Sequence, residues 1–260
     1  MRIALTREVS PAMHRCELSH LARTPIDLDW AVAQHAAYEA ALEGLGCRVE
    51  RLPSDATMPD AVFIEDTAIV VDELAVLTRP GAESRRPEVA AVGPELARLR
   101  PTASIEAPGT IDGGDVLRIG RTLYVGVSAR SNAEGIAQLG RLLAPWDYRV
   151  VGVPTRDCLH LKTAATEAAP GIVVLNPDWV DGEVFGAERL IPVDPGEPFA
   201  GNVLRIGAAT IAAAAFPRTN ARLEAAGVEV RTVEVAEFAK AEGGVTCCSV
   251  IVDVHEGARP

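Results

Sequence analysis

The chain of 260 residues is 48% hydrophobic and 23% charged, a composition typical of a globular protein that buries a sizeable core. Its 36 acidic residues outnumber 25 basic ones, giving a net charge of −11, which argues against nucleic acid as a partner because phosphate binding depends on Lys and Arg. Five cysteines without a CxxC pair do not fit a disulfide-framed secreted domain or a zinc site, so we expect a cytoplasmic protein.

Strand and helix patterns alternate along the chain. Residues 1–9 predict a first strand, and residues 27–45 predict a helix because their apolar positions lie three or four apart. Residues 87–99 predict a weaker helix that Gly93–Pro94 should bend or interrupt. The polar residues expected to cap three helices are Asp27 or Asp29, Ser131 or Asn132, and Thr219 or Asn220.

An internal repeat organises these elements. The heptapeptide GDVLRIG at 114–120 returns as GNVLRIG at 201–207, and each copy continues through an apolar strand into an Arg-Ser/Thr-Asn corner, at 130–132 and 218–220. Looser copies give five starting points, near residues 66, 115, 162, 202 and 247, a spacing of about one supersecondary unit. We expect one domain, residues 1–260, of small sheets around a centre that the polar corners face.

Polar residues that could perform chemistry gather in five stretches. In three of them a structural explanation is strong: an acid-rich turn at 109–115, a solvated arginine loop at 79–86, and a core histidine at 158–163. The acids of residues 59–66 are harder to explain, because Glu65 and Asp66 fall in a run that favours a strand, where acids are depleted.

The fifth stretch, residues 241–252, carries adjacent cysteines on a predicted strand. Side chains on a strand alternate between faces, so one thiol would face a site and the other would point away. Buried structural cysteines would explain the pair equally simply. A Cys, a His and an acid from separate elements are, however, the usual set for nucleophilic catalysis, and the repeat would bring such elements together.

Six motifs, in order along the chain, resemble the dimethylarginine dimethylaminohydrolases of the guanidine-modifying (pentein) superfamily. They are IEDTA at 64–68, TRPGAESRR at 78–86, DGGDVL at 112–117, SARSN at 128–132, HLKT at 160–163 and GGVTCCS at 243–249. The resemblance implies an α/β fold, a five-bladed pseudosymmetric α/β-propeller of repeated ββαβ units.

The resemblance also implies roles for individual residues. Cys247 would be the nucleophile, His160 the general acid/base and Asp112 its partner. The substrate-binding residues would be Asp60 for the α-amine, Arg85 and Arg130 for the α-carboxylate, and Asp66 with Glu65 for the guanidinium. A lid over the site would fall near residues 12–21, with Cys16 or Leu18 at the position where relatives have a leucine.

A member of this family would hydrolyse Nω-methylated arginines to citrulline and methylamine or dimethylamine through a covalent Cys thiouronium intermediate. It would need no cofactor or metal, bind a small cationic amino acid, and act as a monomer or homodimer away from nucleic acid and membranes. Two alternatives stay open: an arginine deiminase-like enzyme that releases ammonia, and a non-catalytic propeller that serves as a binding protein.

Overall fold

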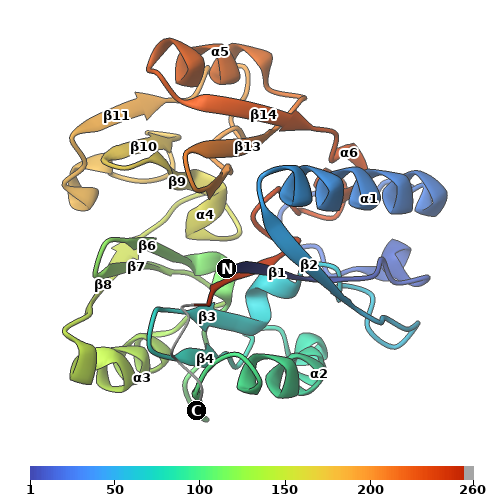
Figure 1. Cartoon of the computed structure of the whole chain (residues 1–260), viewed down its shortest axis with the longest axis vertical. Helices are drawn as coiled ribbons and strands as arrows, with labels where there is room; N and C mark the ends of the chain where they lie inside the picture. The colour runs from blue at the N-terminus through green and yellow to red at the C-terminus, as the bar shows by residue number, and fades with distance from the viewer. Residues whose placement is uncertain (255–260) are drawn as a thin grey trace.

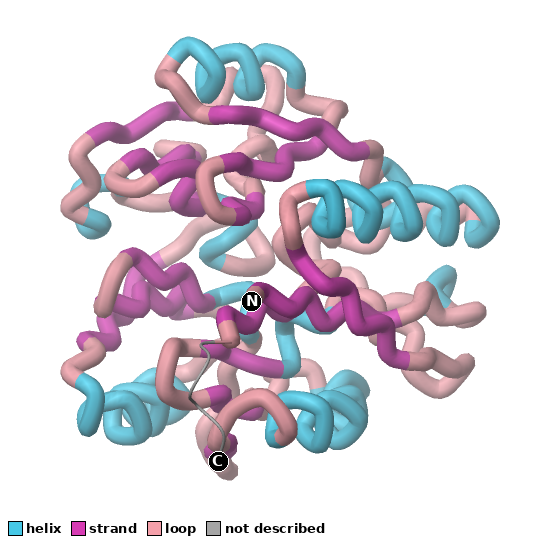
Figure 2. The backbone as a smooth tube through the Cα atoms, in the orientation of Figure 1, coloured by secondary structure: helices cyan, strands magenta, loops and turns pink. Residues whose placement is uncertain are grey.

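The computed structural model describes residues 1–254 and contains five three-stranded sheets arranged around a common centre (Figures 1 and 2). The expected α/β-propeller of five blades is therefore confirmed. The strands of the five blades are β15, β1 and β2 (Val250–Asp253, Arg2–Arg7, Cys47–Leu52); β3, β4 and β5 (Ala68–Val70, Ala75–Leu77, Thr102–Ser104); β6, β7 and β8 (Val116–Ile119, Thr122–Val127, Arg149–Pro154); β9, β10 and β11 (Ala165–Ala169, Ile172–Leu175, Arg189–Pro192); and β12, β13 and β14 (Leu204–Ile206, Ala209–Ala213, Glu229–Val233).

Each blade repeats one connection pattern. The first two strands pair antiparallel, as in Val116 opposite Val125, and a third strand then pairs in parallel with the second. In four blades the antiparallel pair is a hairpin, whereas in the fifth its strands come from the two ends of the chain. The repeated heptapeptide ends in the hairpin glycine: Gly120 and Gly207 have φ of 58° and 63°, a left-handed conformation that other residues adopt at a cost. In four blades a helix joins the second strand to the third, because a parallel partner requires a crossover.

The longer helices lie on the outside of the propeller, while the short α4 (Leu161–Ala164) lies near its centre and the short α6 (Ala236–Ala239) lies beside α1 (Leu28–Gly44) (Figure 1). No helix of the described residues 1–254 is both long and apolar enough to cross a membrane. The outer helices are α1, α2 (Arg86–Ala97), α3 (Ala133–Leu143) and α5 (Pro217–Ala225).

Two caps are confirmed and two helix expectations are wrong. Asp27 accepts from the Trp30 N–H at 3.0 Å, and Asn132 accepts from the Gly135 N–H at 2.8 Å. Helix α5 begins earlier than expected, after Phe216, because Thr219 and Asn220 bond to neighbouring backbone groups at Asp194 and Ala213 instead. Pro94 lies inside an uninterrupted α2, where the buried side chains of Val92 and Leu96 stabilise the helix against one lost backbone bond.

The two ends of the chain complete the same blade. Strand β15 pairs antiparallel with β1, from Arg2 opposite Asp253 to Leu5 opposite Val250, and β1 pairs in parallel with β2. The Arg2 guanidinium also forms an ion pair with Asp253 at 2.8 Å. The repeat that starts near residue 247 therefore supplies one strand, and the predicted first strand of the chain supplies the next. That residues 1–260 act as a single catalytic domain stays a prediction.

The innermost strand of every blade starts a few residues after a predicted repeat start. These strands are β3, β6, β9, β12 and β15, which begin at residues 68, 116, 165, 204 and 250. Inner strands of neighbouring blades contact one another, as β15 does β3 and β9 does both β6 and β12. The tight turns that precede them therefore meet at one end of the propeller axis, and these turns carry most of the polar candidate residues.

Candidate active site

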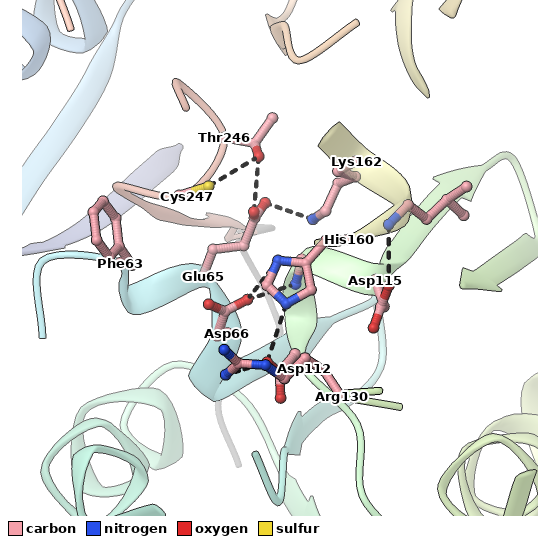
Figure 3. A network of polar contacts seen from close by, with 12 residues as sticks. Phe63, Glu65, Asp66, Asp112, Asp115, Arg130, His160, Lys162, Thr246 and Cys247 are labelled. Atoms are coloured by element: carbon pink, nitrogen blue, oxygen red, sulfur yellow. Dashed lines mark hydrogen bonds and ion pairs between the residues drawn. The ribbon is translucent and has the colours of Figure 1, made fainter. Parts of the chain in front are cut away.

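Three short turns and the cysteine loop bring the predicted catalytic residues together (Figure 3). A 3-10 helix, Ile64–Thr67, precedes β3, and a second, Gly113–Asp115, precedes β6. Asp112 and His160 each occupy the position before such a turn, the N-cap of the Gly113–Asp115 turn and of α4. Glu65 and Asp66 thus lie in a 3-10 turn and not in a strand, which removes the conflict between their charge and strand propensity.

Cys247 and Cys248 also lie outside a strand, so the expectation that they alternate across a sheet is wrong. Residues 244–248 form a turn, and β15 begins only at Val250. The Cys247 N–H donates to the Gly244 carbonyl at 3.2 Å, and the Cys247 carbonyl accepts from the Glu65 N–H at 3.1 Å. Even so, the two thiols differ as predicted in exposure: Cys248 is fully buried, whereas Cys247 reaches a cavity.

The glycine before the cysteine turn is required by close packing. A Cβ on Gly243 would lie 2.2 Å from a ring carbon of Phe63, far inside van der Waals contact. Phe63 in turn stacks edge-on against Phe238, with ring centroids 6.2 Å apart. The cysteine loop is therefore fixed against the wall of the site.

The Cys247 thiol lies in an unfavourable environment for a thiolate. Burial, together with repulsion from the carboxylates of Glu65 and Asp66, raises its pKa to about 12. The Gly244 N–H, 3.3 Å from Sγ, acts in the opposite direction but does not offset these effects. In the empty site the thiol stays protonated, and a cation must arrive before it can become a nucleophile.

His160 lies between two carboxylates (Figure 3). Its Nε2 is 3.1 Å from Asp112 Oδ2, and its Nδ1 is 3.9 Å from Asp66 Oδ1. Burial alone would lower the histidine pKa, but Asp66, Asp112 and Asp115 outweigh it and raise the pKa to about 9. A Cβ on Gly114 would lie 2.5 Å from Nδ1, so a glycine is needed beside the ring. The imidazole is therefore protonated at neutral pH and can act as a general acid.

Asp112 and Asp115 support the turn that carries His160 on the side away from the pocket. Both are fully buried. Asp112 accepts the Gly81 N–H at 2.9 Å, in addition to its contact with His160. Asp115 accepts the Leu161 N–H at 3.0 Å and the hydroxyls of Ser128 and Ser131 at 2.6 Å. These bonds fix the backbone on both sides of His160 relative to the axis.

Arg85 is enclosed by acids and does not project freely into the site. Its guanidinium pairs with Asp66 and, at 2.8 Å, with Glu88, and it donates to the Phe63 carbonyl at 2.9 Å. Burial would raise the Asp66 pKa, but His160 and Arg85 reverse the effect and lower it to about 2. Arg85 borders the same pocket as Cys247, yet its donors already have partners, and its role toward a substrate carboxylate stays a prediction.

Arg130 is the arginine whose donors are less committed. Its Nη1 lies 3.9 Å from Asp112 Oδ2, and its Nη2 donates to the Ser19 hydroxyl at 2.9 Å. The corresponding corner of the other repeat copy differs, since the side chain of Arg218 is 60% exposed and pairs with Asp194 and Glu197. The expectation that both polar corners face the centre is therefore wrong for the Arg218 corner.

The lid segment contacts the predicted α-amine site. Both oxygens of Asp60 accept the Glu17 N–H at 3.1 Å, and burial raises the Asp60 pKa to about 6. Cys16 is 1% exposed, while Leu18 is partly buried and packs on the same hydrophobic cluster as Cys247. Glu242, next to the cysteine loop, accepts the backbone N–H groups of residues 19–21. The lid is thus tied to both sides of the site.

Glu65 supports the cysteine loop through residues that sequence reasoning missed. Its carboxylate pairs with Lys162 and accepts the Thr246 hydroxyl at 2.8 Å (Figure 3). Asn202 makes two hydrogen bonds with Thr246: its amide nitrogen donates to the Thr246 hydroxyl at 2.9 Å, and its amide oxygen accepts from the Thr246 N–H at 3.1 Å. The signals were present in the sequence, because Lys162 belongs to the HLKT motif and Asn202 occupies the Asp115 position of the repeated heptapeptide.

One group of the described residues could offer ligand atoms to a metal ion. The side chains of Asp66, Asp112 and His160 place one such atom each within 4.8 Å of one another. Arg85 already neutralises Asp66, and the Gly81 and Gly114 amides donate to the two carboxylates. A cluster already paired with a buried cation suits the transfer of protons better than the binding of a second cation.

The predicted site residues therefore form one pocket with a supporting shell. Six of the pocket's residues belong to the predicted set, whereas Asp112 and Glu65 lie behind it and act through His160 and Thr246. The six that line the pocket are Asp60, Asp66, Arg85, Arg130, His160 and Cys247.

Comparison with known proteins shows which family contains chains similar to this one. A model described as arginine deiminase matches residues 56–199. The N(G),N(G)-dimethylarginine dimethylaminohydrolase of Streptomyces coelicolor is 41% identical over 249 residues, which cover 95% of each chain. The chain belongs to the dimethylarginine dimethylaminohydrolase family. The enzyme of the same name from Pseudomonas aeruginosa is 34% identical over 234 residues, 89% of this chain and 91% of that one.

Solved structures agree with this membership. A mutant of the dimethylarginine dimethylaminohydrolase of Pseudomonas aeruginosa, complexed with citrulline, superimposes with a TM-score of 0.91 at 31% identity, covering 96% of this chain and 98% of that one. The N-terminal domain of a cyanobacterial arginine dihydrolase gives a TM-score of 0.83 at 20% identity, over 98% and 99% of the two chains, and so shares the fold. The family expected from the six motifs is confirmed.

Proposed function

We propose that this member of the dimethylarginine dimethylaminohydrolase family hydrolyses Nω-methylated arginines to citrulline and dimethylamine or methylamine. The observation that carries the proposal is a single pocket in which Cys247 and His160 face the carboxylate of Asp66. A guanidinium is a planar cation with donors on all sides, and buried carboxylates are its natural partners.

Substrate binding follows from the charges around the pocket. Asp66, deprotonated at neutral pH, would hold the guanidinium next to Cys247. Asp60 at the lid would take the α-ammonium group, and Arg130 would take the α-carboxylate with donors that the Ser19 hydroxyl occupies in the empty site. Arg85 would stay in its ion pairs and orient Asp66, so that fewer of its donors are free for the substrate carboxylate than those of Arg130.

Activation of the thiol would come from the substrate. The pKa of Cys247 is high because burial and the negative charges of Glu65 and Asp66 disfavour a thiolate. A bound guanidinium neutralises that field and lowers the thiol pKa, so that the thiol releases its proton to solvent water. The nucleophile is then formed only when the cation it attacks is present, which protects the resting thiol from oxidation and from other electrophiles.

The covalent step would use His160 as the general acid. The Cys247 thiolate bonds to the guanidinium carbon, and the protonated imidazole donates its proton to the methylated nitrogen. The carbon–nitrogen bond breaks, the amine leaves, and a thiouronium stays on Sγ. His160, now neutral, takes a proton from a water molecule that attacks the same carbon. Collapse of the second adduct breaks the carbon–sulfur bond and releases citrulline.

The deciding experiment incubates the purified protein with asymmetric dimethylarginine, monomethylarginine and unmethylated arginine, and measures citrulline and the released amine. We expect citrulline with dimethylamine or methylamine. Citrulline with ammonia from unmethylated arginine alone would support the arginine deiminase alternative. No citrulline from any of the three, with binding detected by calorimetry, would support the binding-protein alternative.

Several attributes rest on the sequence and stay part of the proposal. The protein would need no cofactor, would bind neither nucleic acid nor a membrane, and would act in the cytoplasm as a monomer or homodimer. The relative from Pseudomonas aeruginosa binds citrulline in its solved complex, which fits a small arginine-derived ligand. Size-exclusion chromatography with light scattering would determine the oligomeric state.

A further inference from the structure

A second, larger cavity adjoins the catalytic pocket. It has a volume of about 370 Å³ and lies between the segment that follows β13, helix α6, the segment before α4 and the lid. Cys247 lines both cavities, as do Leu159, Glu242 and Gly243. The reacting sulfur atom is therefore the point at which two spaces of different chemistry meet.

The walls of the second cavity are apolar. Phe199, Phe216 and Val235 line it together with the exposed alanines Ala215 and Ala239. Its acidic residues do not supply charge to a ligand at its centre: the Glu242 carboxylate accepts three lid N–H groups, and Asp157 is exposed to solvent. The catalytic pocket, in contrast, is lined by Asp60, Asp66 and Arg85 among others. The second cavity suits a hydrocarbon group and not a cation.

The second cavity lies beside the expected place of the leaving nitrogen, although His160 itself borders the catalytic pocket. That nitrogen must lie within reach of His160 while its carbon bonds to Cys247. Leu159 and Thr163, on either side of His160 in the chain, line the second cavity, as do Gly244 and Val245 before Cys247. A substituent on the leaving nitrogen would therefore lie at the border of the apolar space.

The volume exceeds what the methyl groups of the proposed substrates require. A methyl group is about as large as a water molecule, which occupies about 30 Å³ of the liquid. Two methyl groups thus fill a small part of about 370 Å³. An apolar space that opens directly on a reactive thiol, and that two methyl groups fill only in small part, has room for a longer chain.

We propose that this cavity is a subsite for the Nω-substituent, and that the protein also hydrolyses arginines whose Nω-alkyl group is longer than methyl. The proposal rests on the proposed function, because it uses the same nucleophile and acid. The Sγ–carbon bond forms, the bond from that carbon to the alkylated nitrogen breaks, and the alkylamine departs with the proton from His160. Water then completes the release of citrulline.

The test compares kcat/KM for Nω-methyl-, Nω-propyl- and Nω-butyl-arginine, with the released alkylamine identified by mass spectrometry. Each buried methylene contributes up to about fourfold in kcat/KM if its transfer energy is fully realised. We therefore expect the butyl substrate to be turned over at least as efficiently as the methyl one. Phe199→Ala, which removes an aromatic wall at the subsite, should lower the butyl-to-methyl ratio several-fold.

A filling variant and a matched control decide whether the cavity is responsible. Ala215→Phe places a ring in the cavity from an exposed position, and Ala221→Phe makes the same change at an exposed alanine of α5 that does not line it. Ala215→Phe should lower the butyl-to-methyl ratio of kcat/KM about tenfold or more, while Ala221→Phe leaves the ratio unchanged. Thermal melts of both variants check that each is folded.

The outcomes separate the two proposals. Turnover of Nω-methylarginine without turnover of the propyl and butyl analogues overturns the subsite and keeps the proposed function. Equal loss for all substrates in Ala215→Phe also overturns the subsite. Turnover of the butyl analogue alone keeps the subsite and overturns the methylated substrate of the proposed function, and turnover of none overturns both.

Discussion

The two cavities that meet at Cys247 are built from different parts of the repeat. The catalytic pocket takes its reacting groups, Asp66, His160 and Cys247, from the turns before the inner strands of three blades. The apolar cavity draws its walls from segments outside these turns, such as Ala215 after β13 and Ala239 at the end of α6. The turns that recur in the blades therefore supply the reacting groups. The segments that do not recur supply the apolar walls next to which a substituent of the leaving nitrogen would lie.

The two regions also differ in how they are held. Around the catalytic pocket, Asp115 alone accepts three hydrogen bonds, and Arg85 pairs with two buried acids. Buried charges are costly unless each has partners, so this network tolerates little change. The apolar cavity contains exposed side chains such as Phe199, 42% exposed, whose replacement leaves no buried charge unpaired. Mutations in the two regions should therefore produce effects of very different size.

The largest expected effect concerns the residue that the two cavities share. Cys247→Ser should lower citrulline formation by about a thousandfold or more, since a hydroxyl cannot replace the thiolate. Cys248→Ser is the matched control: its thiol is fully buried and 3.7 Å from the Gly244 carbonyl, so the change should lower the melting temperature and leave most of the activity. Equal activity loss in both variants, with unaltered melts, would contradict the assignment of Cys247.

The next effect tests the charged wall alone. Asp112→Asn removes the carboxylate 3.1 Å from His160 Nε2, and should lower kcat by about a hundredfold or more with a smaller change in KM. The kcat of the wild type should fall as pH rises through about 9, where His160 loses the proton it donates, because the bound substrate has already ionised the thiol. In Asp112→Asn this limb should move to lower pH. A limb at an unchanged pH would show that another group titrates.

Arg85 should matter to stability more than to substrate affinity. Arg85→Ala leaves Asp66 and Glu88 buried without their cation, a change that costs about 3–5 kcal/mol of unfolding free energy. Urea denaturation measures the loss. Arg86→Ala next to it is the control, because that side chain is partly exposed and pairs with the exposed Glu83. A stable Arg85→Ala variant with only a raised KM would restore the carboxylate-binding role.

The protonated His160 predicts a pH dependence of stability. Its pKa is about 9 in the folded protein against 6.5 as reference, so its favourable contribution is complete below pH 6.5 and is lost as pH rises through 9. The loss amounts to up to about 3 kcal/mol. Denaturant titrations at pH 6.5 and 9 should show it in the wild type, and His160→Asn should flatten the difference. An equal slope in the variant would assign the dependence elsewhere.

The smallest effect contrasts the two copies of the repeated corner. Arg130→Ala should raise KM for methylarginine about tenfold, because it removes a bidentate donor for the substrate carboxylate. Arg218→Ala, at the equivalent corner, should leave KM within about twofold, since its side chain is mostly exposed and pairs outside the pocket. Steady-state kinetics of the two variants check this. A similar KM change in both would mean that the corner acts through the fold.

Residue patterns predicted the architecture well because the blades share a repeated sequence motif. The five predicted starts lie within four residues of the inner strands, and the heptapeptide's hairpin glycines, Gly120 and Gly207, have the backbone that only glycine adopts easily. The motifs also placed Cys247, His160 and Asp66 in one pocket. Local errors arose where tertiary bonds outweighed propensity, as at the cysteine turn, where the Glu65 N–H takes the Cys247 carbonyl.

The sequence by itself therefore determined the blade pattern, the order of the motifs and the polar residues at the start of each inner strand, because these depend on short-range periodicity and turn chemistry. Only the tertiary structure decided that Arg85 is enclosed by Asp66 and Glu88, that Arg218 turns away, and that a cavity of about 370 Å³ opens beside Cys247. Such features depend on contacts between segments far apart in the chain, whose packing no local pattern specifies.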